Sequence, residues 1–418
     1  MTSTETRRPD EPASATELPK PSVALHTGTS SITALLVRNM RQSGIFVAFV
    51  AIVGLFAILT EGVSLSPGNI TNIVLQYSYI LVLAIGMVIV IIAGHIDLSV
   101  GSVVALSGAT SAVLVIQLGL PWWVGVLAAL GVGVLVGMWQ GFWVAYVGIP
   151  AFIVTLGGML LFRGLTLQVL DNISLSPFPP AYQQTASGFL NGLIGGNGYD
   201  AFTLLIFALA VVGYAFTSFR GRLKRISYDQ PVESFPLFVL RIAVIGAVVM
   251  AFAWQLAHAR GLPIVLIILA VLVIVYGLVT TRTVFGRRVY AIGGNLAAAQ
   301  LSGVNVRATN FWIFVNMGFL AGVAGVIYSS RSNGAQPSAG NMFELDAIAA
   351  VFIGGAAVTG GVGTVVGAMI GGLIMAVMSN GMQLMGVDQS VQSVVKGLVL
   401  LLAVAFDVWN KRRASSSR

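Results

Sequence analysis

Long hydrophobic runs separated by short polar segments dominate the chain from residue 44 onward. A helix that crosses the hydrocarbon core of a bilayer needs about 20 mostly apolar residues, and twelve runs are candidates for such helices. They lie at 44–60, 73–93, 98–118, 122–147, 151–170, 201–218, 236–256, 262–280, 308–329, 345–358, 362–385 and 390–409. The pattern predicts an all-α integral membrane protein, a polytopic helical bundle with about 12 transmembrane helices. The run at 345–358 is short and interrupted by glycine, which is typical of a half-helix or a re-entrant segment.

The composition agrees with a lipid environment. Of the 418 residues, 57% are apolar and 9% are charged, whereas a soluble globular protein carries roughly 25% charged residues. The 49 glycines indicate close helix packing or broken helices, because small residues let helix backbones approach each other. Water is therefore not the main solvent of this protein.

The basic residues lie in clusters between the hydrophobic runs, and their distribution predicts the orientation of the bundle. Cytoplasmic segments of membrane proteins carry an excess of Lys and Arg. With a cytoplasmic N-terminus, twelve crossings leave only Arg260 and Arg331 in the outer segments. The inner segments then hold Arg38, Arg41, Arg220, Arg222, Lys224, Arg225, Arg282, Arg287, Arg288, Arg307, Lys411, Arg412, Arg413 and Arg418. We expect both termini in the cytoplasm, and we interpret the net charge of +8 as topological rather than as a sign of nucleic-acid binding.

The remaining segments define the domain organisation. Residues 1–37 are rich in Ser, Thr, Pro and Glu and are expected to form a disordered cytoplasmic tail. A transmembrane domain follows at 38–410, and a basic cytoplasmic tail at 411–418. The segment 171–199 has no Lys or Arg and is expected to form an extracytoplasmic loop over the outer mouth, whereas 281–307 is expected to form a structured cytoplasmic loop.

A short segment within this cytoplasmic loop has the features of a docking element. It reads GNLAAAQLSG, in which Asn295 can cap a helix, the middle is rich in alanine and Gly303 is suited to end the helix. Two helical turns are marginal in water by themselves, since isolated helices need about 12 to 15 residues. Either a groove on a cytoplasmic partner receives the segment, or it packs against the ends of its own helices.

Four polar residues at the ends of hydrophobic runs are candidates for a translocation path or gate. Asp97 and Ser99 lie in the interruption GHIDLSVGS, where an acid is costly unless it is paired or hydrated. Asp97 either caps the helix that follows it or lines a gate, and the two roles are compatible. Glu344 and Asp346 precede a glycine-rich stretch.

Two basic residues lie inside hydrophobic runs. Arg163 and Lys396 either face a polar cavity that takes sugar hydroxyls or extend along the apolar surface to the outer interface. We expect the second behaviour for Lys396 and leave both alternatives open for Arg163.

The glycines of the run from 341 to 372 also have two interpretations. Gly363, Gly367 and Gly371 have the small-residue spacing that lets helices touch, and we expect packing to be their main role. The Gly360-Gly361 pair is a break that borders the path in the alternative interpretation, because non-helical backbone at membrane depth needs protein or water beside it.

Several kinds of chemistry are absent from the sequence. It has no Cys, only three His and no Gly-x-x-x-x-Gly-Lys-Ser/Thr phosphate loop, so we expect no metal site, no cofactor and no ATP hydrolysis by this chain. No pair of carboxylates and no nucleophile with a base is visible, which argues against a membrane-embedded enzyme. The acids lie at helix ends rather than midway along helices, which disfavours a secondary transporter driven by protons or sodium.

Five phrases resemble the permease family of monosaccharide ATP-binding-cassette (ABC) importers, which handles ribose, xylose, arabinose and galactose. They are AGHIDLSVGS at 93–102, PAFIVTLGGMLLFRGL at 150–165, FGRRVYAIGGNLAAAQLSGV at 285–304, GNMFELDAIAAVFIGGAAVTGGVGTVVGAMIGG at 340–372 and KGLVLLLAVAFD at 396–407. They occur in family order over nearly the whole hydrophobic region. His95, in place of the more frequent glycine, and two extra runs around the basic loop 219–234 are similar to the xylose-type branch, so a core of ten helices plus two is expected.

The resemblance implies a translocation path for a monosaccharide in the bacterial plasma membrane, most plausibly a pentose such as xylose. It implies three protein partners: a second permease copy, a cytoplasmic sugar-type ATPase and an extracytoplasmic sugar-binding protein. The segment that it identifies with ATPase coupling contains Arg287, Arg288, Gly294, Asn295, Ala298, Leu301, Ser302 and Gly303. The candidates for the path or gate are Asp97, Ser99, Arg163, Glu344 and Asp346.

Overall fold

The computed structural model describes residues 40–230 and 232–416. The predicted tail at 1–37 lies outside these ranges. In chain order the elements are α2 (Met40–Leu59), η1 (Val63–Leu65), α3 (Pro67–Ile92), α4 (Val100–Ala112), η2 (Val113–Gln117), α5 (Trp122–Phe142), η3 (Trp143–Val147), α6 (Ala151–Val169), α7 (Pro180–Ser187), β1 (Phe189–Leu190), α8 (Ala201–Ser227), α9 (Phe235–Ala259), β2 (Leu262–Pro263), α10 (Ile264–Arg282), α11 (Val284–Gly294), α12 (Leu296–Leu301), α13 (Val306–Ser332), α14 (Phe343–Ile353), α15 (Val365–Leu384) and α16 (Gln389–Ser416). The π-helical turns η2 and η3 continue α4 and α5.

Nine helices in the described ranges are long and apolar enough to cross a membrane. They are α3, α4 with η2, α5 with η3, α6, α8, α9, α10, α13 and α15. Each corresponds to one of the hydrophobic runs, so the predicted polytopic helical bundle is confirmed. The other three runs form α2, α14 and α16, of which α2 and α16 contain shorter apolar stretches. The count of twelve crossings rests on these three and stays a prediction.

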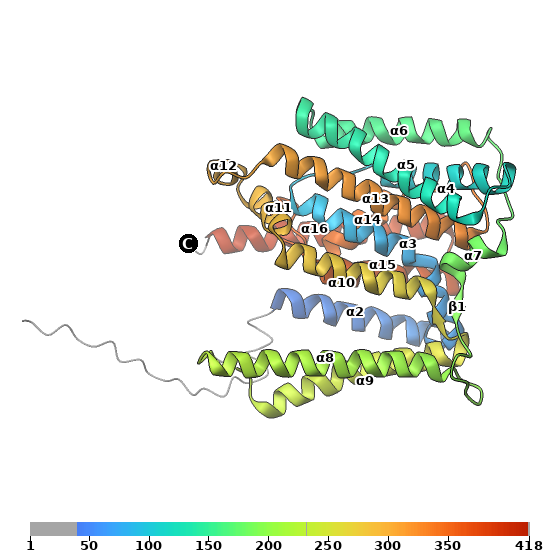
Figure 1. Ribbon diagram of the computed structural model, residues 1–418. Coiled ribbons are helices and arrows are strands. Elements are labelled where there is room, and N and C mark those ends of the chain that lie inside the picture. The colour runs from blue at the N-terminus through green and yellow to red at the C-terminus, as the bar shows by residue number, and fades with distance from the viewer. Residues whose placement is uncertain (1–39, 231, 417–418) are drawn as a thin grey trace, which may run out of the picture.

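The helix α3 lies in the middle of the bundle (Figure 1), where it contacts α9, α10, α13, α14 and α15. Every residue from Tyr77 to Ile92 is buried. A helix that is hydrophobic all round has no polar face to present to solvent, and it is stable where other helices pack around it. The position of another segment along the bundle can therefore be described by the residue of α3 that it contacts.

The helices α8 and α9 are at the opposite extreme. They lie side by side at the edge of the bundle (Figure 1). In the most apolar part of each, 6% of the residues of α8 and 11% of those of α9 are buried, against 89% for α3. These are the two extra runs that flank the basic loop 219–234, and their exposed apolar side chains need lipid around them.

The glycines of α15 pack against α14, as the sequence predicted. A Cβ at Gly371 would lie 2.0 Å from the Ala350 carbonyl oxygen, and a Cβ at Gly367 would lie 2.3 Å from that of Gly354. The two backbones therefore approach more closely than any larger residue permits. Close packing holds the short α14 against a full-length neighbour.

The two ends of the bundle differ in structure (Figure 1). One end, here called the α12 end, carries α11 and α12, the start of α2 and the end of α16. At the other, the α7 end, β1 pairs with β2, and the Phe178 amide donates to Asn333 Oδ1 at 2.9 Å. Both described chain ends therefore lie on one side. The expected tail from 411 continues α16 as helix to Ser416, because Lys, Arg and Ala favour helix and no Gly or Pro interrupts them.

Candidate functional site

The start of α14 lies halfway along α3. Phe343, the first residue of α14, stacks against Tyr79 at the midpoint of α3, with ring centroids 4.5 Å apart. From there α14 runs to the end of α3, where the Gly361 amide donates to the Ile92 carbonyl at 2.8 Å. Its 11 residues span about 16 Å at 1.5 Å each, roughly half of a bilayer core of about 30 Å. The run at 345–358 is therefore a half-helix, one of its two sequence interpretations.

The segment 93–99 brings the chain back from the end of α3 toward its middle. It contains no helix, and seven extended residues reach up to about 25 Å. The stretch of α3 between Tyr79 and Ile92 is about 20 Å long. One short extended segment is thus sufficient to start α4 at the level where α14 starts.

The beginnings of α4 and α14 are in direct contact. A Cβ at Gly101 would lie 2.2 Å from the Gly340 carbonyl oxygen and 2.5 Å from Glu344 Oε2. Gly340 has φ of 72°, a left-handed conformation that favours glycine. We call the two segments 93–99 and 333–342, together with the first turns of α4 and α14, the break.

Asp97 is buried inside the break, where it organises the turn into α4. Its Oδ1 accepts hydrogen bonds from the Ser99 amide at 2.9 Å and from the Ser99 hydroxyl at 2.7 Å. Gln140 of α5 donates to the same hydroxyl, and Thr155 of α6 donates to the Ile96 carbonyl at 3.3 Å. Asp97 thus closes a local turn onto Ser99, the residue that precedes the first residue of α4, rather than capping the helix amides themselves.

Arg163 contacts the 333–342 segment of the break. Its Nη1 donates to the Ala339 carbonyl at 2.5 Å and lies 3.4 Å from that of Pro337. The guanidinium is also within electrostatic range of Glu344. Arg163 therefore points inward and fixes the 333–342 segment, rather than extending to the outer interface.

Asp346 in the first turn of α14 forms an ion pair with Lys396 of α16. Lys396 Nζ lies 3.1 Å and 3.2 Å from the two carboxylate oxygens, and both side chains are mostly buried. The expectation that Lys396 extends to the outer interface is wrong. A buried partner of opposite charge compensates the desolvation that either group would suffer alone.

All five candidate path or gate residues thus belong to one region, although they come from the 93–99 segment, α6 and α14. The sequence interpretation missed Gln140, whose signal is a lone side-chain amide within the long apolar run 122–147. Ser102, which the sequence suggested as a helper of the cap, has a buried hydroxyl with no hydrogen-bond partner among the described residues. Such hydroxyl, amide and carboxylate groups at half depth suit a hydroxylated solute.

A second contact joins the base of the half-helix to α11. Gly293 packs so closely that a Cβ there would lie 1.6 Å from the Ile92 carbonyl oxygen and 2.6 Å from the Gly361 nitrogen. The Tyr290 hydroxyl donates to the Gly363 carbonyl at 2.7 Å. Burial raises the pKa of Tyr290, so the hydroxyl keeps the proton that it donates. We call this contact of α11 with the end of α3 and with the 354–364 segment, which follows α14, the base junction.

The next helix, α12, forms as the sequence predicted. Asn295 Oδ1 accepts from the Ala298 amide at 3.0 Å, which caps the helix, and Gly303 follows the helix with φ of 78°. An asparagine N-cap and a left-handed glycine satisfy orphan backbone groups at both ends. Local chemistry is therefore sufficient to place this element.

The surface of α11 and α12 is almost uncovered. Within α12 only Ala299 is buried, whereas Leu301 is 91% exposed and Leu296 is 48% exposed. All the residues expected in coupling are exposed: Arg287, Arg288, Gly294, Asn295, Ala298, Leu301, Ser302 and Gly303. The alternative in which α12 packs against its own helix ends is thus limited to one alanine.

The described part of the chain contains no cluster of three or more metal-binding side chains. The site is accordingly a set of hydrogen-bonding and ionic groups, and what it can do is position or pass a polar solute and transmit a movement.

Comparison with known proteins identifies the family. The profile of a family described as branched-chain amino acid transport system, permease component, matches residues 69–404. The xylose transport system permease protein XylH of Escherichia coli (strain K12) is 41% identical over 376 residues, 90% of this chain and 94% of that protein. The Haemophilus influenzae XylH is 39% identical, covering 90% and 98%, and the ribose import permease protein RbsC of E. coli K12 is 35% identical, covering 88% and 94%. No solved structure matches.

These findings confirm the resemblance to monosaccharide permeases. The relatives are transport components rather than enzymes, and so is this chain, a multi-pass protein of the bacterial plasma membrane. Because the matching profile covers 69–404, the chain belongs to the family of permease components of branched-chain amino acid transport systems.

Proposed function

We propose that this chain forms the translocation path of an ABC sugar importer that carries a monosaccharide, most plausibly a pentose such as xylose. The observation that carries the proposal is the exposed α11–α12 pair, which rests directly on the base of a broken helix. The choice of xylose is supported by the names of the relatives, since the sequence identity to the xylose permeases exceeds the sequence identity to the ribose permease.

The proposed assembly has three kinds of protein component: the permease, an ATPase and a binding protein. A separate cytoplasmic ATPase docks on the 281–307 loop, an extracytoplasmic binding protein delivers the sugar near the 171–199 loop, and a second permease copy completes the path. The α12 end is then cytoplasmic, which is supported by the basic residues there and by the positive-inside rule. With α2, α16 and the re-entrant 333–342 segment joined to α14, the chain makes twelve crossings with both ends inside, consistent with a single membrane domain at 38–410.

Movement passes from the docking surface to the break through adjacent packed contacts. A force on α12 reaches α11, and the base junction transmits it to the end of α3 and to the 354–364 segment, which joins the end of α14. α14 is a rigid rod only 11 residues long, so displacement of its base displaces its other end, where Glu344 contacts the start of α4. The half-helix is thus a lever that links ATPase closure to a gate at half depth.

The five path or gate residues divide into two roles within this mechanism. Asp97 and Ser99 fix the start of α4, and Arg163 fixes the 333–342 segment. Glu344 and Asp346, in the first turn of α14, move with the lever. Weak, multiple hydrogen bonds to sugar hydroxyls suit a conduit, because tight binding slows release.

The second permease copy is proposed to cover the exposed face of the break. Asn341 is exposed, Met342 is 50% exposed and Leu345 is 40% exposed, all at the level of the midpoint of α3. Non-helical backbone at this depth requires protein or a water-filled cavity beside it. A partner copy that leaves an aqueous path between the two breaks meets both requirements.

Replacement of Ala298 with tryptophan tests the docking role. Ala298 is exposed, so the new side chain does not disturb the fold, but it obstructs a partner groove. We expect co-purification with the ATPase and sugar uptake to fall by about 10-fold or more, as for a central interface residue. Gln230→Trp, an exposed residue of the α8–α9 turn at the same end, is the control. Undiminished complex formation and uptake in Ala298→Trp would remove α12 from the mechanism.

A further inference from the structure

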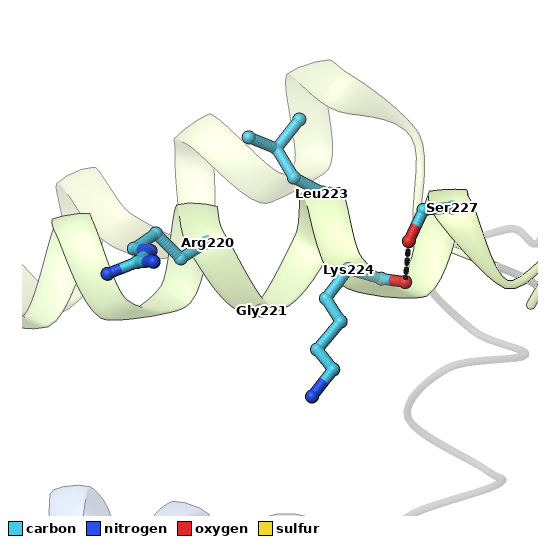
Figure 2. A pocket seen from close by; sticks show the side chains of 5 residues that line it. All are labelled: Arg220, Gly221, Leu223, Lys224 and Ser227. Atoms are coloured by element: carbon cyan, nitrogen blue, oxygen red, sulfur yellow. Dashed lines mark hydrogen bonds between the residues drawn. The ribbon is translucent and has the colours of Figure 1, made fainter.

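The end of α8 bears a shallow, open depression that the transport mechanism does not use. It has a volume of about 600 Å³ and is lined by Arg220, Gly221, Leu223, Lys224 and Ser227. Figure 2 shows the Lys224 side chain extending away from the helix, with the bare backbone of Gly221 between it and Arg220. The depression is at the α12 end of the bundle, on the peripheral pair α8–α9 and away from α12 itself (Figure 1).

Arg220 and Lys224 present uncompensated positive charge to this depression. They are four residues apart, which places them on one face of α8. Neither has an ion pair among the described residues, and Arg220 only leans on the Phe216 ring, 5.6 Å from its centroid. The Ser227 hydroxyl is occupied, since it donates to the Lys224 carbonyl at 2.8 Å. The two cations are thus the free donors of the site.

Neighbouring charges are used differently, to close the α8–α9 turn. Arg222 donates to the Glu233 carbonyl and lies over the Phe238 ring at 5.2 Å. Arg241 pairs with the Glu233 carboxylate at 2.9 Å. The pair with Arg241 neutralises Glu233 internally, so this acid does not compensate Arg220 or Lys224. The other acid of the turn, Asp229, has no ion pair with either cation among the described residues.

The position of the depression relative to the bilayer indicates its ligand. The apolar run of α8 ends at residue 218 and fills the hydrocarbon core, since about 20 residues span it. The following turns of α8 then lie at the level of the lipid headgroups. Leu223 is 51% exposed and Phe219 is 44% exposed, so apolar surface adjoins the two cations. A phosphate linked to acyl chains matches both features, whereas a soluble acidic protein matches only the charge.

We propose that this depression binds the phosphate of an anionic phospholipid, with Arg220 and Lys224 as donors and with Phe219 and Leu223 against the acyl chains. Basic pockets at the cytoplasmic ends of transmembrane helices bind such headgroups. A guanidinium and an ammonium together supply directed donors and charge to phosphate oxygens. The site requires membrane insertion but is independent of the transported sugar.

The test measures phosphatidylglycerol binding to the purified full chain by native mass spectrometry, with phosphatidylcholine as the neutral comparison. Loss of two interfacial cations in Arg220→Gln/Lys224→Gln should weaken phosphatidylglycerol binding by about 30-fold. The control Arg282→Gln/Arg307→Gln removes two exposed cations from the same end and should bind as the original chain does. The exchange Arg220→Lys/Lys224→Arg keeps both charges and should restore binding.

Three results would overturn the proposal. The first is phosphatidylglycerol binding in Arg220→Gln/Lys224→Gln equal to that of the control. The second is equal binding of phosphatidylcholine, which would assign the contact to acyl chains alone. The third is full competition by glycerol 3-phosphate at the lipid concentration, which would assign the site to a free anion. Because both replaced side chains are exposed and have no ion pair within the described part of the chain, a monodisperse preparation with unchanged helical circular dichroism is expected for every variant.

Discussion

The base junction gives the sharpest prediction, because a single methyl group cannot be accommodated there. In Gly293→Ala the new Cβ would lie 1.6 Å from the Ile92 carbonyl oxygen, so α11 must move away by about 1.8 Å to reach ordinary van der Waals contact. Such overpacking costs about 1 to 3 kcal/mol. If the shift also breaks the bond from the Gly361 amide to the Ile92 carbonyl, a further cost of about 1 to 3 kcal/mol follows. We expect destabilisation of about 2 to 6 kcal/mol in total when both effects occur.

The adjacent residue supplies a matched control. A Cβ at Gly294 meets nothing within 4 Å, and its φ is not in the left-handed region. Gly294→Ala should therefore leave the stability unchanged or raise it by up to about 1 kcal/mol, the difference in helix propensity. The assay is thermal unfolding of both variants in the same detergent, followed by ATP-driven sugar uptake in reconstituted vesicles with the ATPase and binding protein.

Gly293→Ala should show a lower unfolding temperature than Gly294→Ala. Any Gly293→Ala protein that still binds the ATPase should support ATP hydrolysis but take up less sugar than the original chain. The reason is that the displaced α11 no longer transmits movement to α14 through the base junction. Equal unfolding temperatures for the two variants would refute the steric argument. Full coupled uptake by Gly293→Ala would refute the base junction as the route of transmission.

Two further predictions concern the break. Lys396→Met leaves Asp346 as an unpaired, mostly buried acid and should destabilise the protein by about 3 to 5 kcal/mol, as measured by thermal unfolding. Addition of Asp346→Asn to this variant should recover most of the lost stability. Absence of recovery would contradict the ion pair as the cause. Because the chain has no native Cys, Asn341→Cys in membranes should form an oxidant-dependent dimer of this 43.7 kDa chain, whereas Leu209→Cys on the exposed face of α8 should not; dimers in the second variant alone would place the interface elsewhere.

Some features follow from the sequence because their causes are local. The hydrophobic runs predict the helices, since a helix satisfies its backbone within one segment and the bilayer requires an apolar exterior. The same is true of α12, in which Asn295 and Gly303 lie within ten residues of each other. The glycine interruption marked 345–358 as shorter than a crossing, and the spacing of Gly367 and Gly371 predicted close helix packing, for which the structure supplies α14 as the partner.

Other features depend on which helices pack together, and the hydropathy pattern carries no information about that. In the sequence, Lys396 is surrounded by apolar residues. Its partner Asp346 lies 50 residues away, on the half-helix α14, whose start packs against Tyr79 of α3. Gln140 was missed because its partner Ser99 belongs to another element.

The sequence alone therefore determined that this chain is a membrane bundle with a short capped helix, α12, because those properties arise within single segments. Only the tertiary structure decided that Asp97, Arg163 and Glu344 share one region at half depth and that Gly293 packs against Ile92 and Gly361. Long-range packing sets these distances, and it depends on the shapes of whole helices rather than on any local pattern.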